Sequence, residues 1–381
     1  MQTTKANLLQ QGAWLMEQSA QQKGYEDGFE QGRRAGYRLG FSEAALGTIP
    51  QDKAPARNLH VLYVTAGIGV PYPALDQAVI DALGDLVQRV TVVNPGEDVA
   101  AAAQSAEPDL VLVLNGVVLE ADTVKRLRQS GFKTAVWFTD DPYYTDWTIS
   151  IAPRYEYIFT LESSCLPFYR KLGCQHVYHL PFAVNPKVFH PKPVPTVYQS
   201  DICFIGTAYW NRVEAIDRLA PILKDKKVVI SGWWWDRLQS YSLLAAKIKL
   251  GDWMTPEETA SYYNGAKIVI NLHRAADDDT INANSRKIPA FSVNPRTFEI
   301  AGCATLQLSD HRPDLGQFYS ANEIGTYGST DELADKIHYY LQHEEERQKI
   351  AFNGLIRTRR DHTYHKRLTA MLDIIFPQID S

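Results

Sequence analysis

Residues 294–310, NPRTFEIAGCATLQLSD, carry the chain's most suggestive chemistry and predict a helix followed directly by a β-strand. Asn294 can cap the helix, and the proline after it suits the first helical position. A helix start with Arg296 and Thr297 suits anionic oxygens, and Glu299 can accept hydrogen bonds from sugar or ribose hydroxyls. The stretch is therefore a candidate nucleotide-sugar site. An ordinary capped helix is the alternative.

Two adjacent carboxylates, Asp140 and Asp141, directly follow the apolar run AVWFT at residues 135–139. The run predicts a strand, and the carboxyl ends of parallel strands face the crevice in which ligands bind. Either aspartate is therefore a candidate general base for an acceptor hydroxyl. Enclosure would raise the pKa of one while its neighbour stays ionised. A solvated turn before Pro142 is the alternative.

The composition is that of an ordinary globular protein. The 381 residues suffice for two domains, with 45% hydrophobic and 22% charged residues. A formal net charge of −5 gives no reason to expect nucleic acid or an anionic membrane as partner. No apolar run approaches the ~20 residues of a membrane span and no signal peptide is evident, so we expect a cytoplasmic protein. The four cysteines lack CxxC spacing, which favours buried free thiols.

Strand-like and helix-like segments alternate through most of the chain, which predicts α/β domains with doubly wound parallel sheets. The first strand, at residues 59–65, leads into a turn with Gly67 and Gly69. This turn is a candidate phosphate or acceptor loop, but it lacks the full GxGxxG pattern, so a simple tight turn is the alternative. The expected segments are an N-terminal helical segment (1–50), a first Rossmann-like domain (58–190), a second (200–360) and a C-terminal helix (361–381).

Residues 24–41 repeat a glycine every four positions, and an aromatic residue follows four of the five glycines. On a helix this spacing places a smooth seam beside an aromatic stripe, which suits close packing. Because each glycine costs roughly 1 kcal/mol in an isolated helix, the segment should be helical only when docked. We expect a self-association or tethering helix, docked either on the body of its own chain or on a second copy in a homo-oligomer. A flexible leader is the alternative, and an unchanged particle mass after truncation near Ala54 would support it.

Several stretches, taken in order, resemble the CgeB/YkvP spore-maturation group of glycosyltransferase-like proteins, which belongs to the GT-B class. They are WFTDDP (137–142), LPFAVNPKVFHP (180–191), the opening stretch (294–310), RPDL (312–315) and HTYHKRL (362–368). The resemblance implies a GT-B fold, with two Rossmann-like domains and a cleft between them. It also implies transfer of a sugar from a UDP- or dTDP-linked donor to a glycan or protein acceptor, without a cofactor or a metal ion.

The same resemblance assigns the start of the second domain to donor binding. Gly206 and Thr207 end a strand and would face the donor phosphates, and Arg212 would pair with those phosphates. The alternative for Arg212 is a surface cation on a helix.

A later strand ends at His273 and Arg274. The imidazole can hydrogen-bond a sugar or a phosphate, and the guanidinium can neutralise a diphosphate. Of the run at residues 233–235, WWW, one ring can stack on a nucleobase, although packing is the commoner role of such a run.

One position departs from the pattern of the class. Many retaining GT-B enzymes carry two glutamates eight positions apart, and if Glu299 is the second, the first position holds Phe291, which cannot ionise. The expected mechanism therefore uses Arg212 and Arg296 for the leaving diphosphate and Glu299 for hydroxyls. Asp140 or Asp141 would act as the base if the reaction inverts configuration.

Three alternative functions differ in how well the sequence supports them. A non-catalytic GT-B-like scaffold in a spore coat or surface assembly would fit the altered glutamate position and the glycine repeat. A carbohydrate epimerase of the same architecture would also cleave a nucleotide-sugar bond. An NAD-dependent enzyme is not expected, because the dinucleotide fingerprint is missing.

Overall fold

The computed structural model describes residues 2–50, 55–251 and 253–377. The chain divides into two compact units, Met1–Thr48 and Ile49–Ser381. The first unit consists of one long helix, α1 (Gln2–Gly47), which runs through the glycine repeat. Its aromatic residues Tyr25, Phe29 and Tyr37 are exposed. Self-association through this helix stays a prediction.

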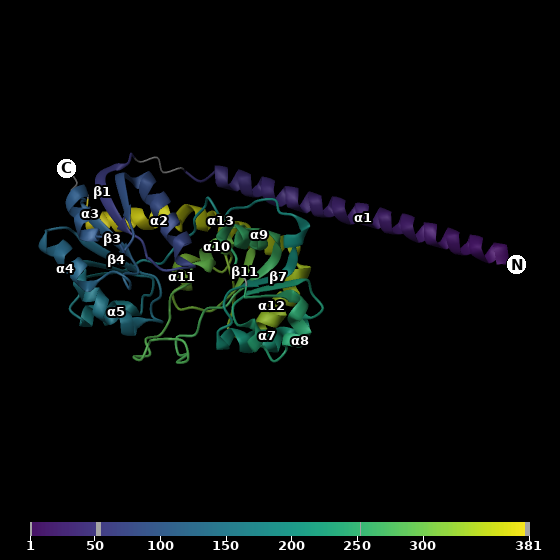
Figure 1. Ribbon diagram of the computed structural model, residues 1–381. Helices are drawn as coiled ribbons and strands as arrows, with labels where there is room; N and C mark the ends of the chain where they lie inside the picture. Colours follow the sequence, from purple (N-terminus) through teal and green to yellow (C-terminus); the bar gives the residue numbers. More distant parts are fainter. Residues whose placement is uncertain (1, 51–54, 252, 378–381) are drawn as a thin grey trace. The chain divides into compact units, whose positions relative to one another are not determined.

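The second unit contains two lobes, each built on a six-stranded parallel sheet (Figure 1). The strand order in the first sheet is β2-β1-β3-β4-β5-β6. Its strands are β1 (Arg57–Val64), β2 (Val87–Val93), β3 (Leu110–Leu114), β4 (Thr134–Phe138), β5 (Tyr157–Thr160) and β6 (His176–His179). The helices of this lobe are α2 (Tyr72–Leu86), α3 (Val99–Ala106), α4 (Ala121–Gln129), α5 (Thr145–Ile151), η1 (Ala152–Arg154) and α6 (Cys165–Lys171).

The second sheet has the order β12-β11-β10-β7-β8-β9. Its strands are β7 (Ser200–Ile205), β8 (Val228–Gly232), β9 (Ile248–Leu250), β10 (Ala266–Asn271), β11 (Leu306–Asp310) and β12 (Gly325–Tyr327). The helices that follow β6 are η2 (Thr196–Tyr198), α7 (Trp210–Leu223), η3 (Trp235–Arg237), α8 (Tyr241–Leu244), η4 (Ala245–Lys247), α9 (Pro256–Gly265), α10 (Arg296–Gly302), α11 (Leu315–Phe318), α12 (Thr330–Gln342), α13 (Glu344–Asp361) and α14 (Tyr364–Ile375).

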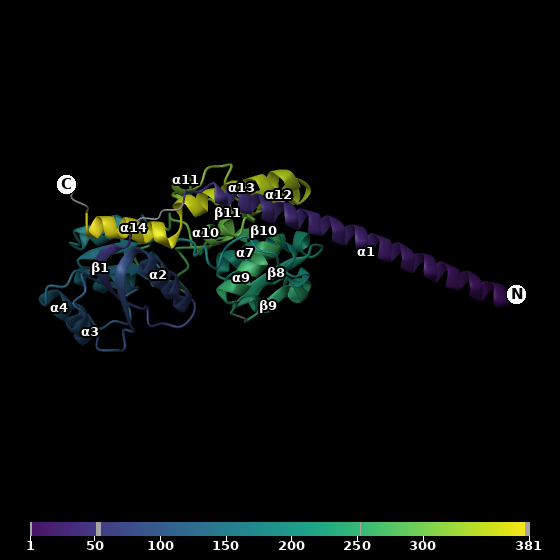
Figure 2. The same cartoon turned by 90° about the horizontal axis from the view of Figure 1, so that it is seen from above.

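Burial explains why these segments form parallel sheets. The central strands β3 and β4 are buried along their whole length, as their unbroken apolar runs predict for strands covered by helices on both faces. The final helix α14 packs its buried residues Leu368, Met371 and Leu372 into the core of the first lobe. Figure 2 shows α14, in yellow, lying along that lobe beside α2. The predicted fold class, two Rossmann-like domains of GT-B type with an N-terminal helix, is confirmed.

Two glycines bring the ends of β7 and β8 together. A β-carbon on Gly232, whose φ is +136°, would lie 2.3 Å from the carbonyl oxygen of Gly206. Only glycine tolerates both that conformation and that approach. The fully buried Trp235 donates its Nε1–H to the same carbonyl over 2.9 Å. The backbone at Gly206 is therefore fixed from two sides.

All four cysteines are buried free thiols, as predicted. None of the helices in the described part of the chain combines the length and the apolarity that crossing a bilayer requires.

Candidate active site

Two guanidinium groups lie over Gly206, directly after β7. A β-carbon on this glycine would lie 3.1 Å from Nη1 of Arg212 and 3.2 Å from Nη2 of Arg296. A third guanidinium is near, because Arg212 and Arg274 approach the ring of Tyr209 to 5.0 Å and 4.6 Å. Among the residues that the structure describes, none of these three arginines forms an ion pair with a carboxylate. Cations gathered without counter-charges are suited to bind an anion.

Arg212 is held rigidly at the start of α7. It is buried, and it donates from Nε to the carbonyl of Leu272 and from Nη1 to the carbonyl of Thr207, each over 2.9 Å. Burial and then the charge of Arg296 lower the pKa of this guanidinium to about 9. The side chain therefore stays charged at neutral pH, with its orientation fixed by the strand ends it bridges.

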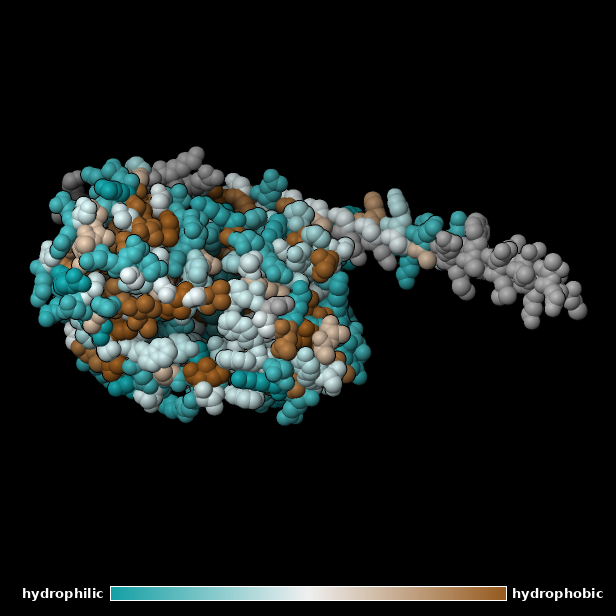
Figure 3. Space-filling view, viewed as in Figure 1, coloured by the Kyte–Doolittle hydropathy of each residue, from teal (hydrophilic) through white to brown (hydrophobic). Residues whose placement is uncertain are grey.

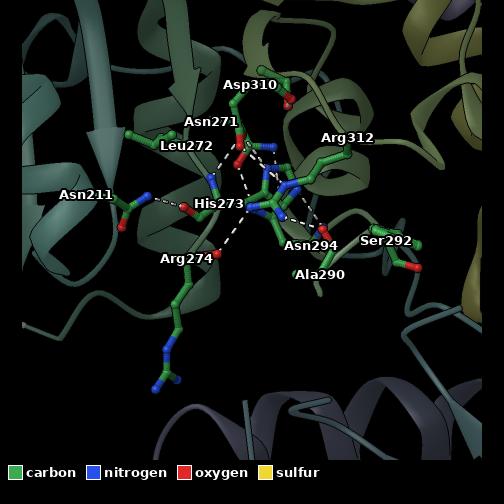
Figure 4. A network of polar contacts seen from close by, with 12 residues as sticks. Asn211, Asn271, Leu272, His273, Arg274, Ala290, Ser292, Asn294, Asp310 and Arg312 are labelled. Carbon is green, nitrogen blue, oxygen red and sulfur yellow. Dashed lines mark hydrogen bonds and ion pairs between the residues drawn. The ribbon is translucent and has the colours of Figure 1, made fainter. Parts of the chain in front are cut away.

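Arg274 extends away from the polar network that surrounds its backbone (Figure 4). The side chain is 7% exposed, yet its Nε and Nη2 lack a hydrogen-bond partner within the described chain. Its guanidinium packs against the rings of Tyr143 and Tyr144 from the first lobe, at 4.6 Å and 5.1 Å. Its carbonyl accepts hydrogen bonds from Tyr143 and Arg312. The structure thus holds a cation without a carboxylate partner in the described chain where tyrosines of the first lobe meet the second lobe.

His273 does not take the predicted role of a ligand contact. It is 2% exposed, its Nδ1 lies 2.5 Å from the carboxylate of Asp310, and its Nε2 accepts the backbone N–H of Asn294 over 2.9 Å. These partners require a neutral ring with its proton on Nδ1. Burial also lowers the pKa of His273. The imidazole therefore positions the chain that enters α10.

Pro295 rather than Asn294 holds the N-cap position of α10, but the side chain of Asn294 still makes the capping hydrogen bond, and its groups are used internally. Its side-chain oxygen accepts the N–H of Thr297 over 3.1 Å. The hydroxyl of Thr297 is fully buried and accepts from Asn271. The seven-residue helix α10 thus offers neither this amide nor this hydroxyl to a ligand. Asn294 and Thr297 build the support of the site, and Arg296 and Glu299 remain as candidate contacts.

Glu299 on α10 is half-buried, and within the described residues its carboxylate has neither a hydrogen bond nor an ion pair. Burial raises the pKa of Glu299 to about 7, although the charge of Arg296 opposes this shift. An unpaired carboxylate beside a cluster of arginines is free to accept hydrogen bonds from hydroxyls of a bound sugar or ribose.

The two adjacent aspartates face different surroundings. Asp141 is 1% exposed, and its carboxylate is enclosed by the hydroxyls of Thr160 and Tyr169 at 2.6 Å and 2.8 Å. Burial raises the pKa of Asp141 to about 7. Because both oxygens of this buried carboxylate already accept hydrogen bonds from hydroxyls, the structure removes Asp141 from the candidate bases and leaves Asp140.

Asp140 is half-buried at the end of β4. Its Oδ2 accepts hydrogen bonds from Tyr72 at 2.7 Å, Thr139 at 2.5 Å and Asn115 at 3.3 Å. Within the part of the chain that the structure describes, its Oδ1 has no partner. One carboxylate oxygen is therefore fixed while the other is open to a substrate.

The chain is similar to known proteins in sequence and in fold. A family model described as Glycosyl transferase-like matches residues 212–373. Spore protein CgeB of Bacillus subtilis (strain 168) is 30% identical over 295 residues, which cover 77% of this chain and 91% of that protein. The chain belongs to the CgeB family of glycosyltransferase-like proteins. The predicted family resemblance is therefore confirmed.

Solved structures show the same fold at low identity. Sucrose-phosphate synthase of Thermosynechococcus elongatus has a TM-score of 0.58 at 12% identity, over 84% of this chain and 98% of that chain. Anabaena HepE in complex with UDP and glucose has a TM-score of 0.56 at 9% identity, over 84% and 99%. The CgeB-family chain therefore shares its two-lobed architecture with these two proteins.

The glycine turn after β1, in the first lobe, has different contacts from the turn at Gly206 in the second lobe. The N–H of Ala66 is taken by the buried carboxylate of Asp76 at 3.1 Å. A β-carbon on Gly67 would lie 2.3 Å from Pro95, whereas one on Gly69 would meet nothing within 4 Å. Glycine at position 67 is therefore explained by the tight turn, which leaves no room for a side chain beside Pro95. A phosphate or acceptor role for Gly67 and Gly69 stays a prediction.

The loop between β10 and α10 is tied to the first lobe. The buried carboxylate of Glu162 accepts the N–H groups of Phe291 and Ser292 at 3.0 Å and 3.1 Å. Asp146 accepts from the hydroxyl of Ser285 at 2.7 Å. The two lobes of this CgeB-family protein are thus held together by a second-lobe loop, and Figure 3 shows a hollow between them on the face viewed.

Sequence reasoning missed the tyrosines around Arg274. Tyr143 and Tyr144 directly follow the Asp-Asp-Pro sequence, and Tyr209 follows Gly206 by three residues. Because these tyrosines follow strand ends, the sequence could have marked them as candidate site residues. The sequence could not show that they converge on Arg274, because they lie about 65 to 130 positions away from it along the chain.

We predict that Asp141→Asn reduces the pH dependence of stability. An acid whose pKa is raised on folding binds more protons when folded, so stability is lost as pH rises from near 4 through about 7. Urea unfolding at pH 5 and pH 8 should show a smaller loss in the variant than in the wild type, with Asp122→Asn on the exposed part of α4 as control. Equal losses in all three proteins would contradict the burial of a protonated Asp141.

Proposed function

We propose that this protein is a glycosyltransferase that moves a sugar from a nucleotide-diphosphate donor, UDP- or dTDP-linked, to an acceptor hydroxyl. The observation that carries the proposal is the group of three arginines, Arg212, Arg274 and Arg296, with no carboxylate partner in the described chain. Arg212 and Arg296 lie over the fixed backbone of Gly206, at the carboxyl end of β7, and Arg274 packs on the ring of Tyr209, as Arg212 does. A leaving diphosphate carries the negative charge that would balance these three guanidinium groups.

On the donor side, the arginines would stabilise the charge that develops on the leaving diphosphate. Glu299 would accept hydrogen bonds from the hydroxyls of the sugar or ribose. Of the three tryptophans after β8, Trp235 is buried in packing, whereas Trp233 and Trp234 are each 38% exposed. The ring of Trp233 lies 5.7 Å from that of Trp253, and the ring of Trp234 lies 6.3 Å from that of Tyr209. We therefore propose that Trp233 or Trp234 stacks on the nucleobase.

On the acceptor side, Asp140 would orient the hydroxyl through its open Oδ1 and accept its proton in an inverting reaction. The fixed Oδ2 supports this role, because Tyr72, Thr139 and Asn115 hold the carboxylate in one orientation. The tie between the lobes through Glu162 keeps the donor and acceptor groups in register.

We also propose that arginines, rather than a metal ion, neutralise the diphosphate. The described residues include no group of three or more His, Cys, Asp or Glu side chains that could hold an ion. The three guanidinium groups supply positive charge at the same place.

The name of the relative, spore protein CgeB, supports a role in modifying a spore or surface structure. A scaffold role in such an assembly is the second candidate, favoured by Phe291 at the position of the first glutamate. An epimerase is the third, and it would release an altered sugar without any acceptor.

We predict that UDP or dTDP raises the melting temperature of the protein. A ligand at 100 times its Kd stabilises the folded state by about 2.7 kcal/mol. Arg274→Gln should weaken nucleotide binding by tenfold or more, because it removes one charge-assisted contact. Arg218→Gln, on the exposed side of the same helix as Arg212, should leave binding unchanged.

The measurement is thermal shift across a panel of nucleotides and nucleotide sugars. No shift with any member would contradict the glycosyltransferase proposal and favour the scaffold.

We predict that Asp140→Asn lowers kcat by about 10²-fold or more while the Kd for the nucleotide stays unchanged. The amide keeps the hydrogen bonds to Oδ2 in part but cannot accept a proton. Steady-state kinetics with parallel nucleotide titration measure both quantities. Unchanged turnover would show that the reaction needs no base at this position, as in a retaining mechanism.

A further inference from the structure

An exposed pair of stacked aromatic rings lies on the same turn of the first lobe as Asp140. The ring of Trp147 on α5 is stacked on that of Tyr144, with 4.5 Å between centroids and 5° between planes. Trp147 is 49% exposed, although it is a large apolar side chain. The N–H of Trp147 donates to the carbonyl of Tyr144, and that of Tyr143 donates to the carbonyl of Asp140. The turn therefore presents a flat apolar plate and a carboxylate together.

The plate is continuous with the donor site. The hydroxyl of Tyr144 lies 3.4 Å from Nη1 of Arg274, one of the three arginines proposed to bind the diphosphate. Asp140 lies four residues before Tyr144 on the same turn; its Oδ2 is held by the Tyr72 hydroxyl, and its Oδ1 has no partner among the described residues. A sugar on this plate would therefore lie on the turn that carries the proposed base, beside the tyrosine that contacts an arginine of the donor group.

We infer that Trp147 and Tyr144 bind a sugar ring of the acceptor, so that the acceptor is a saccharide. This inference rests on the proposed function. The apolar C–H face of a pyranose is complementary to the exposed face of an indole, and the hydroxyls at its edge suit a carboxylate such as Asp140. The stacked Tyr144 fixes the orientation of Trp147 before the ligand arrives, which lowers the entropic cost of binding.

The test uses the full chain saturated with UDP and a panel of saccharides: glucose, galactose, N-acetylglucosamine, rhamnose and their short oligomers. Saturation-transfer NMR measures their binding. We expect at least one saccharide to bind, with affinity at least about tenfold lower in Trp147→Ala and largely retained in Trp147→Phe, which keeps a ring. Tyr339→Ala, at an exposed aromatic residue on α12, is the matched control and should bind as the wild type does.

The outcomes separate this inference from the proposed function. If UDP still stabilises every variant but no saccharide binds, or if binding is equal in Trp147→Ala and the wild type, the saccharide plate is wrong and the donor site stands. Binding of a serine- or threonine-containing peptide that depends on Trp147 would also overturn the saccharide class. If UDP fails to bind the wild type, the proposed function itself fails.

Discussion

The site depends on keeping three like charges close together without a carboxylate between them. Such a group repels itself and loses hydration on burial, so the fold must hold it in place. Arg212 is held by carbonyls at the ends of two strands, and Arg274 by tyrosine faces and a backbone that accepts two side-chain donors. The close approach of Gly232 to Gly206 allows this arrangement, because a side chain at either glycine would displace it.

A second layer of polar contacts gives the charged groups their geometry. Asp310, His273 and the N–H of Asn294 form a chain that sets where α10 begins, and therefore where Arg296 and Glu299 point. The ring of His273 must stay neutral to accept that N–H, and its burial favours the neutral form because it lowers the pKa of the imidazole. The first lobe adds Glu162, which holds the loop before α10. The arginine group is thus supported by both lobes, although all three arginines come from the second.

Much of the fold follows from local sequence. Unbroken apolar runs such as residues 110–114 and 134–138 predict buried parallel strands, and their alternation with helices predicts the two doubly wound sheets. The three-residue strand β9 and the short helix α5 carry too little periodic signal to be predicted. The TDWTISI sequence of α5 is rich in β-branched residues, so packing overrides its local preference.

The types of residue at the site could be predicted from the sequence, but not which of them are free to contact a ligand and which only support the others. Arg212, Arg296 and Glu299 sit where the helix and strand boundaries suggest. Thr297 and His273 have the right chemistry, yet their partners come from other strands and consume their hydrogen bonds. The contrast between Asp140 and Asp141 depends on which face of β4 each one meets, and two adjacent letters in a sequence do not show this.

The most direct measurement of the central claim is a crystal structure of the protein with UDP. The account predicts diphosphate oxygens within hydrogen-bond distance of at least two of the three guanidinium groups of Arg212, Arg274 and Arg296, above Gly206. A diphosphate bound elsewhere, or oriented with its oxygens away from all three, would contradict it.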